Sequence, residues 1–376
     1  MTRKQNAMID EKNEISSCFG QNCRITIFGR SHGPSIGARI EGFPAGIDYD
    51  EAFVLKMMAR RAPGGAFATK RRESDLPLIL SGIKDGKTDG SPILMEIQNT
   101  NQHSSDYGEM VLPRPSHADY PAFVKYGGKA DLRGGGHFSG RLTAPMVFGG
   151  ALAMLYLRQK GVRIGSHLLG VGFARDRSFG EETPTEALLD SLFSSPFPVL
   201  DGEAGEYMKE EISLAQLDGD SVGALIECAA LGLPVGLGEH MARGVEGTLS
   251  SILFGIPAVK GVQFGEGFDF VKMRASAAND GYAYNEKGQV TLLSNHCGGI
   301  VGGMTTGAPL LLQVAFKPTP SIFKPQRTVN LKTGEDEILE IKGRHDPCIG
   351  LRALPVVESA VALGLLDLFL DEEKKA

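Results

Sequence analysis

The sequence is short of cysteine and of long apolar runs. Its five cysteines are scattered and lack the paired spacing of zinc sites or disulfide frameworks, so we expect free thiols and a reducing compartment. No uninterrupted apolar run reaches about 18 residues, and residues 1–16 are polar and charged, unlike a signal peptide. These features argue against a secreted or membrane-spanning protein, and we expect a cytoplasmic location.

The sequence also lacks an excess of basic residues. Its formal net charge is −6, which argues against a nucleic-acid binder whose affinity depends on many phosphate contacts. A protein that binds nucleic acid through Lys70, Arg71 and Arg72 is therefore the least favoured interpretation. A locally basic pocket remains compatible with the acidic total.

Glycine is abundant. It occupies 49 of 376 positions, about 13% where ~7% is usual. The glycines gather in short clusters, which predicts tight turns whose exposed backbone amides suit anions. The remaining composition, 42% apolar and 22% charged, is that of an ordinary globular protein.

Strand and helix patterns are mixed along the chain without a strict βαβ rhythm. Alternation or apolar runs predict strands over residues 24–29, 78–81, 93–98 and 222–229. Helical periodicity predicts helices over 50–61, 143–160, 204–218 and 355–369. Asp50 is a candidate N-cap, Pro63-Gly64 a stop signal, and Gly161 a left-handed cap.

No linker rich in proline, serine and glycine divides the chain. We therefore expect a single large α+β domain over residues 17–370 rather than two doubly wound halves. A polar N-terminal extension, which could be disordered, precedes it at 1–16. A charged, solvated tail follows at 371–376.

Five segments combine glycine turns with basic or imidazole side chains, the ingredients for holding a ligand with phosphate and carboxylate groups. They lie at residues 29–33, 60–73, 114–141, 295–321 and 343–348. Taken singly, most have a plain structural interpretation: a surface turn for His32, a solvated helix face for Arg60 and Arg61, an exposed Lys317. The three consecutive glycines at 134–136 fit such an interpretation less well because they are costly in chain entropy.

Together and in this order, the five segments resemble the signature regions of chorismate synthases. The resemblance rests on Ser-His-Gly at 31–33, Arg-Pro-Ser-His-Ala-Asp at 114–119, Arg-Gly-Gly-Gly at 133–136, Lys-Pro-Thr at 317–319 and Gly-Arg-His-Asp-Pro-Cys at 343–348. It covers roughly residues 17 to 370. The family fold that it implies is a single α+β domain with helices sandwiched between antiparallel β-sheets, assembled as a homotetramer.

The resemblance implies a lyase that depends on reduced FMN. Such enzymes catalyse the anti 1,4-elimination of phosphate from 5-enolpyruvylshikimate 3-phosphate to give chorismate, the last step of the shikimate pathway to aromatic amino acids. The reduced flavin is FMNH2, and NADPH is a candidate reductant for it. No metal is implied, nor a nucleic-acid or membrane partner.

The resemblance also implies roles for individual residues. His32 is expected to protonate the leaving phosphate, His117 to balance the charge of the reduced flavin, and Asp346 to help the flavin N5 accept the ring proton. Phosphate and carboxylates are expected to be held by Arg61, Arg114, Arg141 and Arg344. The expected FMN contacts are His137, Phe138, Ser139, Pro257, Ala258, Gly302, Lys317, Pro318, Thr319, Pro320, Ser321 and Arg344.

The sequence departs from the family pattern at several positions. Arg30 stands where glutamate is usual, Ala62 replaces an arginine, and the stretch after Gly64 is about one residue short. Further departures are His137-Phe138 for Arg-Ser, Thr306 for asparagine and Leu351 for proline. They motivate an alternative: a catalytically impaired homologue that binds FMN or a phosphorylated ligand.

Overall fold

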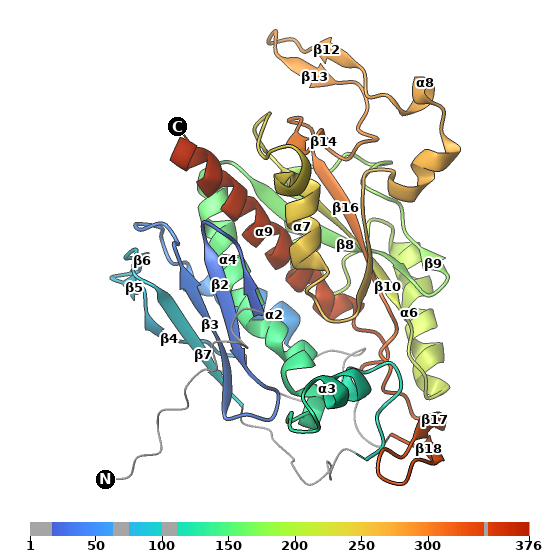
Figure 1. The fold of residues 1–376 in the computed structure, drawn as a ribbon. Coiled ribbons are helices and arrows are strands. Elements are labelled where there is room, and N and C mark those ends of the chain that lie inside the picture. The colour runs from blue at the N-terminus through green and yellow to red at the C-terminus, as the bar shows by residue number, and fades with distance from the viewer. Residues whose placement is uncertain (1–16, 63–74, 100–110, 342–344, 376) are drawn as a thin grey trace.

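Two five-stranded antiparallel sheets enclose a layer of helices in the computed structural model (Figure 1). The structure describes residues 17–62, 75–99, 111–341 and 345–375. The first sheet has the order β1-β2-β3-β7-β4, formed by Cys18–Phe19, Arg24–Gly29, Ser35–Glu41, Ile93–Gln98 and Leu78–Ser81. The second has the order β11-β16-β10-β8-β9, formed by Val259–Phe264, Leu310–Phe316, Ala224–Leu231, Arg163–Val171 and Ala174–Arg175. This arrangement confirms the predicted α+β class.

The helices between the sheets carry the core. They are α2 (Glu51–Arg61), α4 (Thr143–Gln159), α7 (Val245–Leu253) and α9 (Gly350–Lys375). Helices α5 (Glu186–Ser194) and α6 (Gly202–Leu217) pack against the second sheet. Two shorter helices are α3 (Asp119–Lys125) and α8 (Ala275–Ala278). Four two-stranded pairs complete the fold: β5 (Ile83–Lys84) with β6 (Lys87–Thr88), β12 (Tyr282–Tyr284) with β13 (Val290–Leu292), β14 (Ile300–Val301) with β15 (Met304–Thr305), and β17 (Gln326–Val329) with β18 (Asp336–Leu339).

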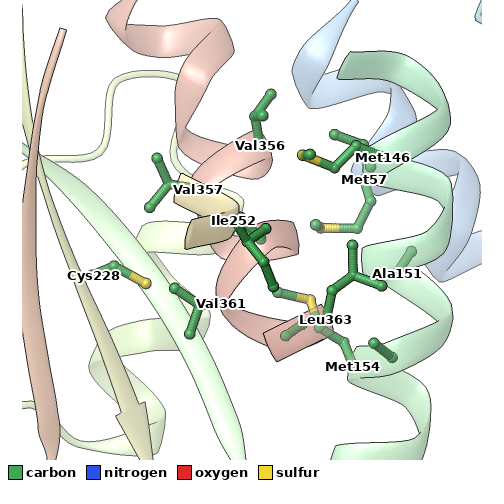
Figure 2. Close-up of a cluster of buried hydrophobic side chains, with 14 of the residues drawn as sticks. Met57, Met146, Ala151, Met154, Cys228, Ile252, Val356, Val357, Val361 and Leu363 are labelled. Carbon is green, nitrogen blue, oxygen red and sulfur yellow. The ribbon is translucent and has the colours of Figure 1, made fainter. Parts of the chain in front are cut away.

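Side chains of α2, α4, α7 and α9 meet in a continuous apolar interior (Figure 2). Helices α4 and α9 are buried over most of their length, because sheets and helices cover them on several sides. The two helices also approach closely: a Cβ on Gly150 would lie 2.2 Å from the Cβ of Ser359. A larger residue at position 150 would force the two helices apart.

Two stretches, Arg133–Gln159 and Gly350–Lys375, are long and apolar enough to cross a membrane by length and composition. The fold buries 83% and 94% of their most apolar windows. The core between the sheets therefore accounts for their apolar character.

Several predicted elements are confirmed. The strands at 24–29, 78–81 and 93–98 have the predicted bounds. Asp50 caps α2, since its Oδ1 accepts a hydrogen bond from the Phe53 amide at 2.9 Å. Gly161 follows α4 with a left-handed φ of 79°. The predicted stop signal at Pro63-Gly64 lies outside the described residues.

The last helix is longer than predicted at both ends. It starts at Gly350, five residues before Pro355, and continues to Lys375. The charged residues at its C-terminus are held by partners: Tyr156 donates to Glu373 at 2.7 Å, and Lys375 contacts Glu239 at 2.7 Å. Residues 371–375 are therefore the last turn of this helix, and from Glu373 to Lys375 they are exposed.

Candidate active site

The turn that carries His32 packs directly on the glycine loop at 133–138. The Ser31 amide donates to the Gly136 carbonyl at 3.1 Å. Gly134 has a φ of 60°, and a Cβ there would lie 2.1 Å from His32 Cε1. Any side chain at position 134 would displace the imidazole. The glycines predicted to matter therefore give His32 its place.

A buried carboxylate, Asp75, joins two of the predicted arginines. Its Oδ2 lies 2.8 Å from Nη2 of Arg61, and its Oδ1 accepts from Nη1 of Arg141. The Arg61 side chain is 2% exposed. Two guanidinium groups share this one carboxylate, so the trio of Arg61, Asp75 and Arg141 keeps a net positive charge. Such a charge suits an anionic ligand.

Asn99 connects this trio to the His32 turn. Its Oδ1 accepts from Arg141 Nε at 3.2 Å, while its Nδ2 donates to the carbonyls of Gly33 at 2.9 Å and Arg30 at 3.2 Å. Neither Asn99 nor Asp75 was predicted as part of the site. They have no local sequence signal, since only the fold brings them beside Arg141.

Arg114 and His117 lie together at the start of α3. Asp119 accepts from Arg114 Nε at 2.7 Å and from its Nη2 at 2.9 Å, which fixes the guanidinium. Burial alone would raise the pKa of Asp119, but the hydrogen bonds from Arg114 outweigh it and lower the pKa. His117 Nε2 lies 2.8 Å from Ser321 Oγ, so the segments at 114–119 and 317–321 meet as predicted.

His117 is neutral near pH 7. Burial is the main cause, and the positive charges of Arg114 and Lys317 add to it; together they lower the pKa of His117 to about 4. A further contribution comes from His345, which places the segment at 345–348 near His117. A neutral imidazole here can accept a proton when an anionic ligand arrives.

Lys317 is held by two backbone carbonyls in strained positions. Its Nζ donates to Ser116 O at 2.6 Å and its amide donates to Ala258 O at 3.0 Å. Ser116 and Ala258 have φ angles of 58° and 75°, a region that residues other than glycine seldom adopt. Such strain clusters at functional sites. The predicted FMN residues Ala258 and Lys317 are thus brought together.

Asp346 is buried and bound by Arg352, whose Nη1 donates to its Oδ2. Arg352 Nε also donates to the Arg61 carbonyl at 3.0 Å. These bonds join the loop at 345–348 to the trio of Arg61, Asp75 and Arg141. Hydrogen bonds therefore lead from Asp346 through Arg352 to Arg61, and from Arg141 through Asn99 to the His32 turn. His345, next to Asp346, is close enough to His117 to influence its pKa.

Two polar atoms in this region are buried without a hydrogen-bond partner among the residues that the structure describes: Thr319 Oγ1 and His345 Nε2. Their segments lie side by side, because Ser221 Oγ donates to Thr319 O at 2.6 Å and the Val222 amide donates to Pro347 O at 2.8 Å. Leaving a buried polar atom unpaired is costly. A bound ligand with polar groups would satisfy both atoms.

Three further predicted flavin residues, His137, Phe138 and Ser139, lie in and after the glycine loop. Ser139 Oγ accepts from the Arg141 amide at 3.3 Å and so belongs to the trio's surroundings. The His137 ring lies 4.2 Å from that of Phe138, centroid to centroid. Burial, with the charges of Lys125 and Arg30, lowers the pKa of His137.

Gly302 lies elsewhere in the chain. The neighbouring Gly303 carbonyl accepts from the Val245 amide at the N-terminus of α7, whereas Ala258 follows the C-terminus of that helix. The nine residues of α7 span about 14 Å. Within a single chain, Gly302 therefore does not lie beside Ala258 and Lys317. Arg344 and the segment after Gly64 lie outside the described residues.

Arg30, which departs from the family pattern, has a counter-charge. Its Nε lies 3.6 Å from Asp131 Oδ2, and Arg133 approaches the same oxygen at 2.7 Å. The hydrogen bond from Arg133 is the main cause that lowers the pKa of Asp131 to about 2. The positive charge beside His32 is therefore partly offset by a stably ionised carboxylate.

No group of three or more histidine, cysteine, aspartate or glutamate side chains is arranged to hold a metal ion within residues 17–62, 75–99, 111–341 and 345–375. The charges in the described part of the site come from arginine, lysine and aspartate side chains.

Comparison with known proteins gives a consistent match over nearly the whole chain. A family model described as chorismate synthase matches residues 23–370. The chorismate synthase of Aeropyrum pernix is 43% identical over 356 residues, which cover 94% of this chain and 93% of the relative. That of Thermococcus gammatolerans is 45% identical over 350 residues, covering 93% and 96%. A solved structure titled "Crystal Structure of Chorismate Synthase" superposes with a TM-score of 0.73 at 27% identity, covering 94% of this chain and 93% of that one.

Proposed function

The chain belongs to the chorismate synthase family, and we propose that it catalyses the anti 1,4-elimination of phosphate from 5-enolpyruvylshikimate 3-phosphate, giving chorismate, with reduced FMN bound beside the substrate. The observation that supports the proposal is the hydrogen-bonded network joining the His32 turn, Arg141, Arg61 and Asp346, with His345 close enough to His117 to influence its pKa. These residues come from distant parts of the sequence; the same network includes Arg61 and Arg141, and Arg114 lies near His117.

The residues present fit a flavin. The buried unpaired atoms Thr319 Oγ1 and His345 Nε2 need polar partners, and the glycine loop gives close access to backbone. His137, Ser139, Ala258, Lys317 and the residues up to Ser321 would hold FMN. When bound, the reduced flavin is electron-rich and supplies the electronic work of expelling phosphate without net redox change.

Phosphate departure needs positive charge and a proton, because an uncompensated dianion in a water-poor site is strongly disfavoured. We assign the charge to Arg61, Arg114 and Arg141, with Arg344 as a further candidate. Asp75 and Asp119 fix the guanidinium groups in place without cancelling the total charge. His32, held against Gly134, is the proton donor to the leaving phosphate.

His117 and Asp346 serve the other half of the reaction. A neutral His117 takes up positive charge when the reduced, anionic flavin binds and so balances it. The Asp346 carboxylate, held by Arg352, assists the transfer of the ring proton.

We further propose a cytoplasmic homotetramer. Large apolar side chains are exposed on the segment between β11 and β16, which projects from the body of the molecule around β12 and β13 (Figure 1). Phe268, Tyr282, Tyr284 and Leu293 are each more than two-thirds exposed. Such a cluster suits an interface between subunits. In this assembly Gly302 would serve the flavin of a neighbouring subunit, since α7 separates it from Ala258 in its own chain.

Anaerobic incubation of the enzyme with chemically reduced FMN and the enolpyruvyl phosphate tests the proposal. Equal amounts of phosphate and chorismate are expected. A parallel reaction with oxidised FMN and NADPH shows whether the protein reduces its own flavin. Tight FMN binding without either product would instead favour the catalytically impaired homologue that Arg30 suggests.

A further inference from the structure

Arg352 connects three parts of the site. It lies in the first turn of α9, and its side chain is 26% exposed. One end of its guanidinium donates to Asp346 Oδ2, and its Nε donates to the carbonyl of Arg61, the last residue of α2, at 3.0 Å. The side chain is thereby fixed at two points.

One attachment point, the Arg61 carbonyl, is itself rigid. Arg61 is buried and bound to Asp75, so the carbonyl that receives Arg352 Nε cannot easily move. A guanidinium is planar and presents its donors in fixed directions. The position of the Asp346 carboxylate therefore follows from the positions of α2 and α9.

Three groups interact with Asp346 from nearby described residues. His345 precedes it, and the negative charge of Asp346 partly opposes the lowering of the His345 pKa by burial and Arg114. Cys348 follows; burial, with a smaller contribution from Asp346, raises its pKa to about 11. Arg352, on α9, binds the carboxylate directly.

We propose that Arg352 is a positioning residue for Asp346: it holds the carboxylate in the place where it assists proton transfer, and the Arg61 carbonyl holds Arg352. This inference rests on the proposed function, because it assigns Arg352 a role in the same reaction. The competing explanation is that Arg352 merely fastens the start of α9 to α2.

A double-mutant cycle separates the two explanations. Arg352→Gln and Asp346→Asn are made singly and together, with Arg352→Lys as the conservative variant. Arg39→Gln is the matched control, since Arg39 forms an exposed ion pair with Glu41 on β3, away from the site. kcat and KM are measured anaerobically with reduced FMN, and FMN affinity and melting temperature are measured for each variant.

We expect Arg352→Gln to lower kcat by roughly 10- to 100-fold, because small misplacements of a reacting group carry costs of that order. KM and FMN affinity should change little. Arg352→Lys should recover part of kcat, and Arg352→Gln should have no further effect in the Asp346→Asn background. If Arg352→Gln proves too unstable to assay, Arg352→Lys takes its place in the cycle.

Equal losses of kcat in the presence and absence of Asp346 would overturn the proposal, as would a melting-temperature loss without a kcat effect. Its failure is distinguishable from failure of the proposed function. In the first case the wild-type enzyme still makes chorismate, and in the second it does not.

Discussion

At the scale of single residues, charge is controlled by burial and by fixed neighbours. His117 lies among cations in a buried place and is neutral, whereas Asp131 and Asp119 lie beside arginines and have lowered pKa values. Nearby cations lower the pKa of both kinds of group, which leaves the imidazole neutral and the carboxylates ionised. The site therefore offers fixed cations and a neutral imidazole to an incoming anion.

His117 makes the stability of the protein depend on pH in a defined direction. Its pKa is lowered from 6.5 to about 4 in the folded state. As the pH falls from 6.5 towards 4, the unfolded chain binds a proton that the folded chain does not, so the free energy of unfolding falls. We expect His117→Gln to reduce this fall, as measured by urea unfolding at about pH 7.5 and pH 5. His240→Gln, on an exposed histidine, is the control; the same pH dependence in both variants would contradict the assignment.

Gly134 should tolerate no side chain because of His32. Gly134→Ala adds a Cβ that would lie 2.1 Å from the imidazole, so we expect kcat to fall by about 100-fold as His32 is displaced. Gly86→Ala is the matched control, since Gly86 also has a positive φ but no atom within 4 Å of its Cβ position. Both variants carry similar backbone strain, of order 1 kcal/mol. Equal activity in the two would mean that His32 is not held by this loop.

At the scale of elements, the second sheet contains a row of polar residues that crosses four strands. His167, Glu227, Gln313 and Gln263 stand opposite one another on β8, β10, β16 and β11. His167 lies 2.9 Å from Glu227 and 3.2 Å from Asp176, and it is fully buried. Burial alone would lower the pKa of His167, but its two carboxylate partners raise it.

Removing the imidazole from this row should destabilise the protein. His167→Ala leaves Glu227 and Asp176 buried without their shared cation, which costs about 3–5 kcal/mol in comparable buried pairs. Because the pKa of His167 is raised, its charged form stabilises the fold fully below pH 6.5 and less as the pH rises through the folded-state pKa. Urea unfolding at pH 6 and pH 8 measures both effects. A loss below 1 kcal/mol at pH 6 would show that the row is unimportant for stability.

Local patterns predicted some elements well and others poorly. The strand at 24–29 and the cap at Asp50 follow from alternation and from a side chain that bonds its own helix. The end of α9 was not predicted from the local pattern; residues 371–375 also contact Glu239 and Tyr156, which are distant in sequence.

The candidate site shows the same division. The motifs identified His32, His117 and Lys317, which lie in short segments that also contain glycine, proline or charged residues. Asp75, Asn99 and Arg352 carry no such local signal; they belong to the site because the first sheet and α9 bring them to Arg61 and Arg141. Residues that position other site residues are identified by their contacts in the folded structure, and a single sequence does not reveal them.

At the scale of the whole molecule, the two sheets and the helices between them bring distant segments to one region, while the segment around β12 and β13 projects outward (Figure 1). We predict that this segment mediates assembly. Tyr282→Ser/Tyr284→Ser/Leu293→Ser should lower the mass measured by light scattering from tetramer to a smaller species. Phe173→Ser, on an exposed phenylalanine of the body, is the control. An unchanged mass in the triple variant would place the interface elsewhere.

The central claim is that His117 and Asp346 act in one site on one reaction. Its most direct test is the anaerobic turnover number of His117→Ala, Asp346→Ala and the double variant with reduced FMN. We predict that each single variant is slower than wild type by ~10²-fold or more, and that the double variant is little slower than the worse single one, because residues that act as a unit are not additive. Wild-type rates in either single variant would contradict the account.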